Sequence, residues 1–351
     1  QDTKRAFVPF IKVPSMEQSS QLDAYSAELS QAEEELSSPN AEDAKVFEEF
    51  LSTAPDSLGV HWAKFKTTDA KSTMDSTLTI LEDQSVLASG ENPAKDDHVI
   101  TLQTEETDLR LLLFEAMPDP SFPNGRVGRA DNGNAVLSQF SAEAISIVNP
   151  EKKKILNFTW AWADHEQPDS DFQVVNILDA DFARGWAVNG HQISGGRTAM
   201  LLAGESFGYP GGTEIRITLF YQSIYSQHTL GRVRITPGAI SDTGLNALPV
   251  ADSTWYATWP YKPKEKYSGY EEVFGPEADA TIDFTKKYPP DNYSWVYRIE
   301  LKDDQVNSVL PAGEVVSFAG KRLFVPSARN LEISLGSDDG VQVFLDGKMT
   351  L

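Results

Sequence analysis

The chain has 351 residues, no cysteine and a formal net charge of −22 at pH 7, from 30 Lys and Arg against 52 Asp and Glu. That charge argues against nucleic acid or an anionic membrane as partner, because both repel an acidic surface. The absence of cysteine excludes disulfides, thiolate zinc sites and covalent c-type haem attachment within this sequence, so we expect no haem here. The sequence has no apolar run of 18 residues, so we expect no membrane insertion.

The first 54 residues predict an extended arm followed by two helices. Pro9 and Pro14 break any helix before residue 15. Residues 16–36 place Leu22, Tyr25 and Leu29 on one apolar stripe, and a second amphipathic stretch covers residues 41–53. We predict a short helical hairpin, which either connects to something N-terminal or braces the next domain.

From His61 the hydrophobic period changes to two, which predicts β-strands. The clearest case is the segment in which Leu156, Phe158, Trp160 and Trp162 alternate with smaller or polar residues. Alternation places these four large side chains on one buried face of a sheet. The spacing of the turns predicts a β-sandwich over residues 55–238. Further strands are expected at 78–80, 99–102, 109–114, 136–147, 199–203, 215–221 and 230–235.

Residues 239–252 lack periodicity and contain glycine and proline, so we place a linker there. Residues 253–351 are again β-like, and they predict a second jelly-roll domain in series with the first. Trp295 is expected in its core. Because the chain ends four residues after the Asp346-Gly347 turn, we expect this second sandwich to be incomplete and the chain to belong to a longer protein. The expected fold class is therefore mainly β.

Two loops carry oxygen-rich sequences that suit a hard cation. The loop between the strands at 109–114 and 136–147 contains Asp131 and Asn134, and a later turn contains Asp338 and Asp339. We predict Ca²⁺ as a candidate cofactor at these four residues. The alternative is that the same side chains only satisfy backbone amides in ordinary turns.

Other residues suggest ligand contacts or catalysis. His191 with Arg197, and Asp164-His165-Glu166, are candidate sugar-contacting or acid–base groups. Trp186, Trp255 and Trp259 are candidate exposed platforms, since aromatic faces pack against sugars. Gly204-Glu205-Ser206-Phe207-Gly208 has the spacing of a nucleophile elbow, but a strand and not a helix is expected to follow it. A serine esterase that uses Ser206 is therefore the weakest alternative.

Several motifs occur in order along the chain: Asp83-Gln84-Ser85-Val86 with Gly90, Glu115 with Pro118, Gly128-Arg129 with Asn132-Gly133-Asn134, Ala163-Asp164 with Gln167, Asp179 to Asp181 with Gly185-Trp186, and Gly231-Arg232-Val233-Arg234. They resemble the β-sandwich region between the conserved domains of planctomycete-type cytochrome c proteins, although Ala135, Gln139 and Ala180 depart from that pattern. The segment from Asp179 and Asp181 to Trp186 also looks like the rim loop of discoidin or galactose-binding jelly rolls. Residues 336–347 are similar to the protective-antigen-like jelly roll.

This resemblance implies a non-catalytic, extracytoplasmic region of a large exported protein, at the cell surface or in the periplasm. We expect a polysaccharide or glycoconjugate as ligand, held through Trp186, Asp164, His165, Asp179, Asp181, His191 and Arg197 and assisted by Ca²⁺. Other domains of the same protein are the second expected partner. The main alternative is a structural spacer or assembly module without a small ligand.

Overall fold

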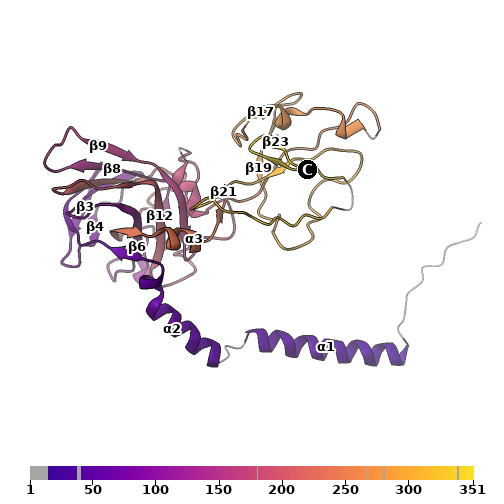
Figure 1. The fold of residues 1–351 in the computed structure, drawn as a ribbon, viewed down its shortest axis with the longest axis horizontal. Helices are drawn as coiled ribbons and strands as arrows, with labels where there is room; N and C mark the ends of the chain where they lie inside the picture. Colours follow the sequence, from indigo (N-terminus) through magenta and orange to yellow (C-terminus); the bar gives the residue numbers. More distant parts are fainter. Residues whose placement is uncertain (1–14, 38–40, 180, 267, 280, 338–339) are drawn as a thin grey trace, which may run out of the picture. The chain divides into compact units, whose positions relative to one another are not determined.

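The computed structural model describes residues 15–37, 41–179, 181–266, 268–279, 281–337 and 340–351. It divides into two compact units, residues 1–57 and 58–351. The fold is mainly β with helices at the N-terminus, as predicted from the sequence (Figure 1).

The first unit contains the two predicted helices, α1 (Met16–Ser37) and α2 (Ala41–Ser57). A capping box begins α1: Ser15 Oγ accepts the Gln18 N–H at 3.2 Å, and Gln18 Oε1 accepts the Ser15 N–H at 2.9 Å. The stripe of α1 stays exposed, however, with exposed fractions of 56% for Leu22 and 61% for Leu29. Over these residues the close packing expected of a hairpin is absent.

The second unit is built around two antiparallel sheets. The larger sheet has the order β10-β12-β6-β14-β4-β3, with β1 also paired to β14, and the smaller has the order β2-β5-β13-β8-β9. The larger sheet contains β1 (Val60–Trp62), β3 (Ser76–Ile80), β4 (Val86–Gly90), β6 (Leu109–Met117), β10 (Phe158–Ala163), β12 (Arg197–Phe207) and β14 (Arg232–Ile240). The smaller sheet contains β2 (Lys66–Ser72), β5 (Asp96–Thr104), β8 (Gln139–Ser146), β9 (Lys153–Leu156) and β13 (Thr213–Tyr221).

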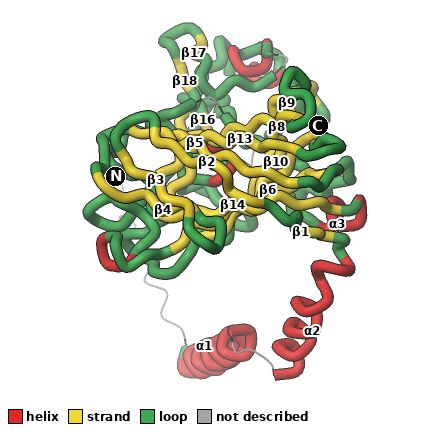
Figure 2. The backbone as a smooth tube through the Cα atoms, turned by 90° about the vertical axis from the view of Figure 1, so that its left-hand side faces the viewer, coloured by secondary structure: helices red, strands yellow, loops and turns green. Residues whose placement is uncertain are grey.

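One hydrophobic core lies between these sheets, which Figure 2 shows as two layers of strands. Phe114 of β6 and Phe140 of β8 come from different sheets and meet edge to face, with ring centroids 6.3 Å apart. The chain passes from one sheet to the other between these two strands, through a loop that contains the 3₁₀ turn η1 (Pro123–Gly125) and β7 (Val136–Leu137). This shared core is the arrangement of a β-sandwich.

A β-bulge changes the faces of β10. Phe158 is opposite Ala203 of β12, but Trp160 is opposite Leu202, so two residues of β10 face one of β12. Phe158 therefore belongs to the core between the sheets, while Trp160, which is fully buried, belongs to a second cluster. Trp162 is 39% exposed, so its predicted burial beside Phe158 is wrong.

The second cluster joins the sandwich to the segment that follows it. Trp160 packs there with Leu245 of α3 (Asp242–Ala247) and with Ala251, and its indole N–H donates to the Pro249 carbonyl at 2.9 Å. The predicted linker at 239–252 thus holds the end of β14, α3 and β15 (Ala251–Asp252). Residues 58–351 accordingly form one compact unit.

Residues 253–351 form short antiparallel pairs around an aromatic cluster. Tyr256 stacks on Phe284 with centroids 4.3 Å apart, and Trp295 meets Phe284 edge to face at 5.2 Å. Trp295 is 7% exposed, which confirms its predicted burial. Each strand described here has two residues, so a second sandwich stays a prediction. The strands are β16 (Tyr256–Ala257), β17 (Lys287–Tyr288), β18 (Tyr293–Ser294), β19 (Val296–Tyr297), β20 (Ala319–Gly320), β21 (Leu323–Phe324), β22 (Phe344–Leu345) and β23 (Lys348–Met349), and the 3₁₀ turns are η3 (Ser268–Tyr270) and η4 (Gly275–Ala278).

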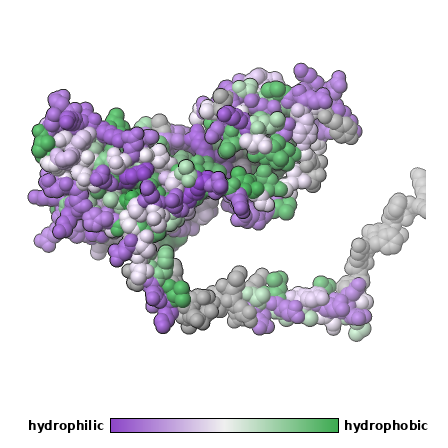
Figure 3. Space-filling view, viewed as in Figure 1, coloured by the Kyte–Doolittle hydropathy of each residue, from purple (hydrophilic) through white to green (hydrophobic). Residues whose placement is uncertain are grey.

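The face drawn in Figure 3 is largely hydrophilic over the sandwich, and hydrophobic residues gather in small groups. Within residues 253–351, Ile333, Leu345 and Met349 are each more than half exposed. The alternating residues Leu331, Ile333 and Leu335 form no strand among the described residues. No helix among the described residues has the length and apolar character needed to cross a membrane.

Candidate functional site

Trp186 does not form the predicted platform, because it is buried in the sandwich core with an exposed fraction of 0%. It belongs to β11 (Trp186–Ala187), which pairs with β7. Its ring lies edge to face against Phe114 at 5.9 Å, and its N–H donates to the His165 carbonyl at 2.9 Å. A Cβ at Gly185 would lie 2.3 Å from the Leu137 carbonyl oxygen, so only glycine allows this close pairing. The Gly185-Trp186 motif, which resembles a rim loop in sequence, therefore forms part of the packed core in this structure.

Arg197 is also committed to the fold. Its guanidinium is 3% exposed and donates to five backbone carbonyls, those of residues 188, 193, 194, 195 and 196, at 2.7–3.3 Å. These bonds hold the loop that leads into β12. Burial lowers the pKa of Arg197 from its ordinary value. The prediction that Arg197 contacts a ligand is wrong, because its donors are already occupied.

Asp164, His165 and His191 lie near this loop but do not form a catalytic set. Asp164 is exposed, and His165 Nε2 lies 3.2 Å from the side-chain amide nitrogen of Asn189. Burial, followed by the charge of Arg197, lowers the pKa of His165. His191 is half-buried, and its Nδ1 has no hydrogen-bond partner. A role of these three residues in ligand binding stays a prediction.

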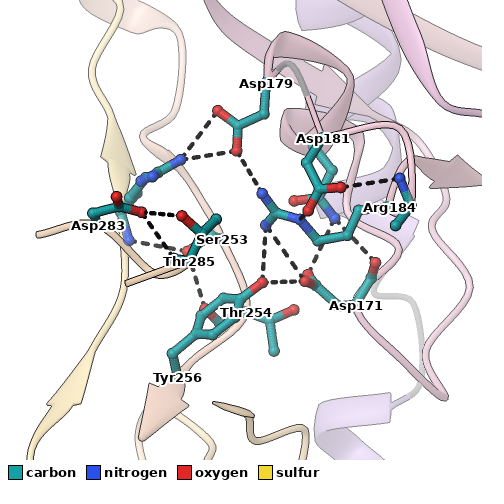
Figure 4. Close-up of polar contacts among 12 residues, drawn as sticks. Asp171, Asp179, Asp181, Arg184, Ser253, Thr254, Tyr256, Asp283 and Thr285 are labelled. Atoms are coloured by element: carbon teal, nitrogen blue, oxygen red, sulfur yellow. Dashed lines mark hydrogen bonds and ion pairs between the residues drawn. The ribbon is translucent and has the colours of Figure 1, made fainter. Parts of the chain in front are cut away.

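Asp179 and Asp181 bind arginines of the same chain (Figure 4). Arg184 Nη2 lies 2.9 Å from Asp179, and Arg184 Nε lies 3.0 Å from Asp181. Asp179 also accepts two bonds, at 2.8 and 3.0 Å, from Arg322 of the C-terminal segment. Both aspartates therefore have a structural role in these ion pairs, and their contact with a ligand stays a prediction.

The same cluster continues inward through Asp171 and Tyr256. Asp171 is 4% exposed, accepts the Tyr256 hydroxyl and lies 3.5 Å from Arg184. Arg184 donates to the Tyr256 oxygen at 2.9 Å. Burial alone would lower the pKa of Arg184, but Tyr256 and the neighbouring aspartates raise it, so it stays charged. We call Asp171, Asp179, Asp181, Arg184, Tyr256 and Arg322 the Arg184 network. It fastens the C-terminal segment to the sandwich loop at 171–185.

The predicted calcium sites gain no support from the geometry. Asn134 is 6% exposed, and its side chain accepts the Gly190 N–H at 2.8 Å and donates to Gln167 at 3.0 Å. Asp131 is exposed. The Asn134 amide thus bridges two loops, and a cation site at this residue stays a prediction. Asp338 and Asp339 lie outside the described residues. Within the part of the chain that the structure describes, no group of three His, Asp or Glu side chains is placed to hold a metal.

Ser206 lies within β12, which continues to Phe207, and the next element is β13. A nucleophile elbow needs a strand, a sharp turn and a helix, and the helix supplies the oxyanion-binding amide. The surroundings of Ser206 are antiparallel strands and so lack that helix. The backbone carbonyl of Ser206 accepts a bond from Lys154 at 3.4 Å.

The structure instead shows a polar cleft of about 200 Å³, which we call the Trp255 cleft. It lies between the 166–173 loop of the sandwich and the C-terminal segment. Its charged and aromatic lining side chains are Glu166, Asp252, Trp255, Lys302, Asp303 and Lys321. Of these, Trp255 and Glu166 were sequence candidates, while Asp252 and Lys321 are far apart in the chain and carry no local motif.

Lys321 organises one wall of the Trp255 cleft. Its ammonium group lies 5.2 Å from the centre of the Trp255 ring, contacts Asp252 and lies 2.6 Å from Asp303. The Trp255 indole N–H donates to Asp303 at 3.0 Å, which fixes the orientation of the ring. Burial would lower the pKa of Lys321, but the two aspartates raise it. This lysine is therefore charged and paired.

Glu166 forms the opposite wall of the Trp255 cleft. It is half-buried, and its Oε1 accepts the Val174 N–H at 2.6 Å, at the start of η2 (Val174–Leu178). Burial raises the pKa of Glu166 to about 7; the Val174 hydrogen bond opposes this, and the negative charge of Asp252 adds to it. No Lys, Arg or His of the described residues lies within ion-pair distance of Glu166. Near neutral pH it can therefore either donate or accept a proton.

Comparisons with known proteins assign no family. No protein-family model matches the sequence, and no curated protein is significantly similar to it.

Proposed function

We propose that this chain is a non-catalytic carbohydrate-binding region of a larger exported protein of the planctomycete-type cytochrome c class, and that it binds a polysaccharide or glycoconjugate at the Trp255 cleft. The observation that carries the proposal is a half-buried indole beside paired charged groups in one concave surface. Carbohydrates need this combination, since an apolar ring packs against their C–H faces while carboxylates and amines bind their hydroxyls.

The size of the cleft limits the ligand. At about 200 Å³ it is smaller than the roughly 300–1,000 Å³ of sites that enclose drug-sized molecules. One sugar unit at a chain end or along a polymer fits such a volume better than an enclosed oligosaccharide. The extracytoplasmic location follows from the proposed class, and the acidic surface suits neutral or cationic polymers more than anionic ones.

Affinity electrophoresis through gels that contain different polysaccharides tests the proposal. The comparison uses the full chain, Trp255→Ala and the matched control Trp259→Ala, whose side chain is 59% exposed and does not line the cleft. We expect at least one polysaccharide to retard the wild type and the W259A control, and retardation to fall at least tenfold in W255A. Thermal unfolding of each variant separates lost binding from lost folding. The proposal fails if no polysaccharide retards the chain, or if W255A binds like wild type.

The same gels with and without EGTA test for calcium. If Asp338 and Asp339 bind Ca²⁺ that receives sugar hydroxyls, EGTA will abolish retardation and Asp338→Asn will do the same. If EGTA leaves retardation unchanged, binding does not require Ca²⁺ and is assigned to the side chains of the Trp255 cleft.

The Arg184 network favours a second function, that of a structural spacer. Six side chains from the sandwich and the C-terminal segment form the hydrogen bonds and ion pairs that join these two parts. A spacer that keeps other domains of the protein at a fixed separation needs such a joint. This alternative predicts that no glycan binds and that Arg184→Met exposes the 240–253 connection to proteases.

A further inference from the structure

The Trp255 cleft holds one acidic side chain whose charge has no partner. Lys321 is matched by Asp252 and Asp303, and Lys302 is exposed at the margin of the cleft. Within the described residues, the Glu166 carboxylate forms one hydrogen bond, with the Val174 N–H, and no ion pair. Three carboxylates then face the one ammonium group of Lys321, so the interior of the cleft carries two excess negative charges when Glu166 is ionised.

A ligand cation is the natural partner for this carboxylate. Desolvation of an unpaired carboxylate is costly, and a nearby opposite charge offsets that cost. A ligand carboxylate or sulfate would instead face Glu166, Asp252 and Asp303 together, which penalises uronic acids and sulfated glycans. The overall charge of −22 also raises the local concentration of cationic polymers.

Resting on the proposed function, we infer that the Trp255 cleft selects glycans that carry a free, protonated amino group, with the sugar ring against Trp255 and the ammonium group paired with Glu166. Hexosamine units of a deacetylated polysaccharide have this chemistry. N-acetylated units keep the ring but lose the charge, and so they lack the contact with Glu166.

The pairing is linked to protons. Burial raises the pKa of Glu166 to about 7, so part of the free protein carries a proton on this residue at neutral pH. An ammonium group favours the ionised form, and binding will release that proton. The other charged groups that line the cleft are Asp252, Asp303, Lys302 and Lys321.

Isothermal titration at pH 6.5 in 150 mM salt tests the inference with three tetrasaccharides: fully deacetylated chitosan, chitin and polygalacturonate. Salt at this concentration screens the attraction between a cationic ligand and the acidic surface only in part. Tetralysine, a cation without a sugar, is therefore included to measure that attraction alone. We expect the chitosan oligomer to bind at least tenfold more tightly than the chitin oligomer and than tetralysine, and the galacturonate oligomer to bind most weakly. Heats measured in two buffers of different ionisation enthalpy will show proton release.

Two variants assign the preference to one residue. Glu166→Gln keeps an oxygen for the Val174 N–H but cannot ionise, so it should bind chitosan and chitin oligomers within a factor of about two of each other. Asp169→Asn removes an exposed carboxylate of the same loop that does not line the cleft, and it should keep the tenfold preference.

The outcomes are distinguishable. If chitin binds as tightly as chitosan, or if E166Q keeps the preference, the selection for amino groups is wrong while carbohydrate binding stands. If tetralysine matches chitosan, the cleft recognises charge without a sugar and the inference is wrong. If no saccharide binds, both the inference and the proposed function are wrong.

Discussion

Replacing Glu166 by glutamine should stabilise the protein at alkaline pH and leave its stability unchanged in acid. The carboxyl has an ordinary pKa of 4.5, whereas burial raises it to about 7 in the folded chain. Below pH 4.5 the side chain is protonated in both states. Between pH 4.5 and 7 the unfolded chain ionises first, so wild-type stability falls as pH rises. The gap between the two pKa values corresponds to about 3 kcal/mol when both states are ionised.

Urea unfolding followed by tryptophan fluorescence at pH 4.5, 6 and 8 measures this effect. The difference in unfolding free energy between E166Q and wild type should rise from near zero to as much as about 3 kcal/mol. The Val174 N–H keeps its acceptor in the variant, so no new unsatisfied group offsets the gain. Glu151→Gln, in the exposed turn between β8 and β9, is the control for a lost surface carboxylate. A pH-independent difference would refute the claim that the folded structure holds Glu166 protonated near neutral pH.

Three further variants test the structural roles found for residues first considered as ligand contacts. Arg184→Met leaves Asp171 buried without its cation and should lower the unfolding free energy by about 3 kcal/mol or more; an unchanged melting temperature would contradict the Arg184 network. Trp186→Ala should cost about 3–5 kcal/mol through the cavity that it leaves, as measured by urea unfolding, whereas a surface platform would cost almost nothing. Arg197→Ala frees five carbonyls and should make thermolysin cut the loop near Ile193 at least tenfold faster, and a wild-type cleavage rate would show that the loop does not depend on this arginine.

The sandwich strands could be predicted because their apolar residues alternate over several positions, as in β13, where every second side chain packs in one core. The prediction failed at Trp162, because the bulge before Trp160 shifts the register and no local signal marks it. The helices at 16–37 and 41–57 were predictable from their apolar period. Whether the two helices pack against each other could not be predicted, because apolar spacing within a helix does not identify the surface that it contacts.

The candidate site was harder to predict than the fold. Asp179 carries the pattern of a binding loop, but its partner Arg322 is 143 residues away. In the Trp255 cleft, Lys321 approaches Asp252 only because β15 pairs with β21. Pairings of this range depend on the three-dimensional arrangement, so the sequence indicated Trp255 and Glu166 of the cleft but not Asp252 or Lys321.

The position of Trp160 has a consequence for any attempt to isolate the sandwich as a fragment. Its side chain is covered by Leu245 and Ala251, and Phe324 of β21 packs against the same cluster. A fragment that stops at residue 238 would leave this indole in water and remove the carbonyl that its N–H binds. Expression boundaries for a well-behaved fragment should therefore extend past Phe324, even though the regular sheets end at Ile240.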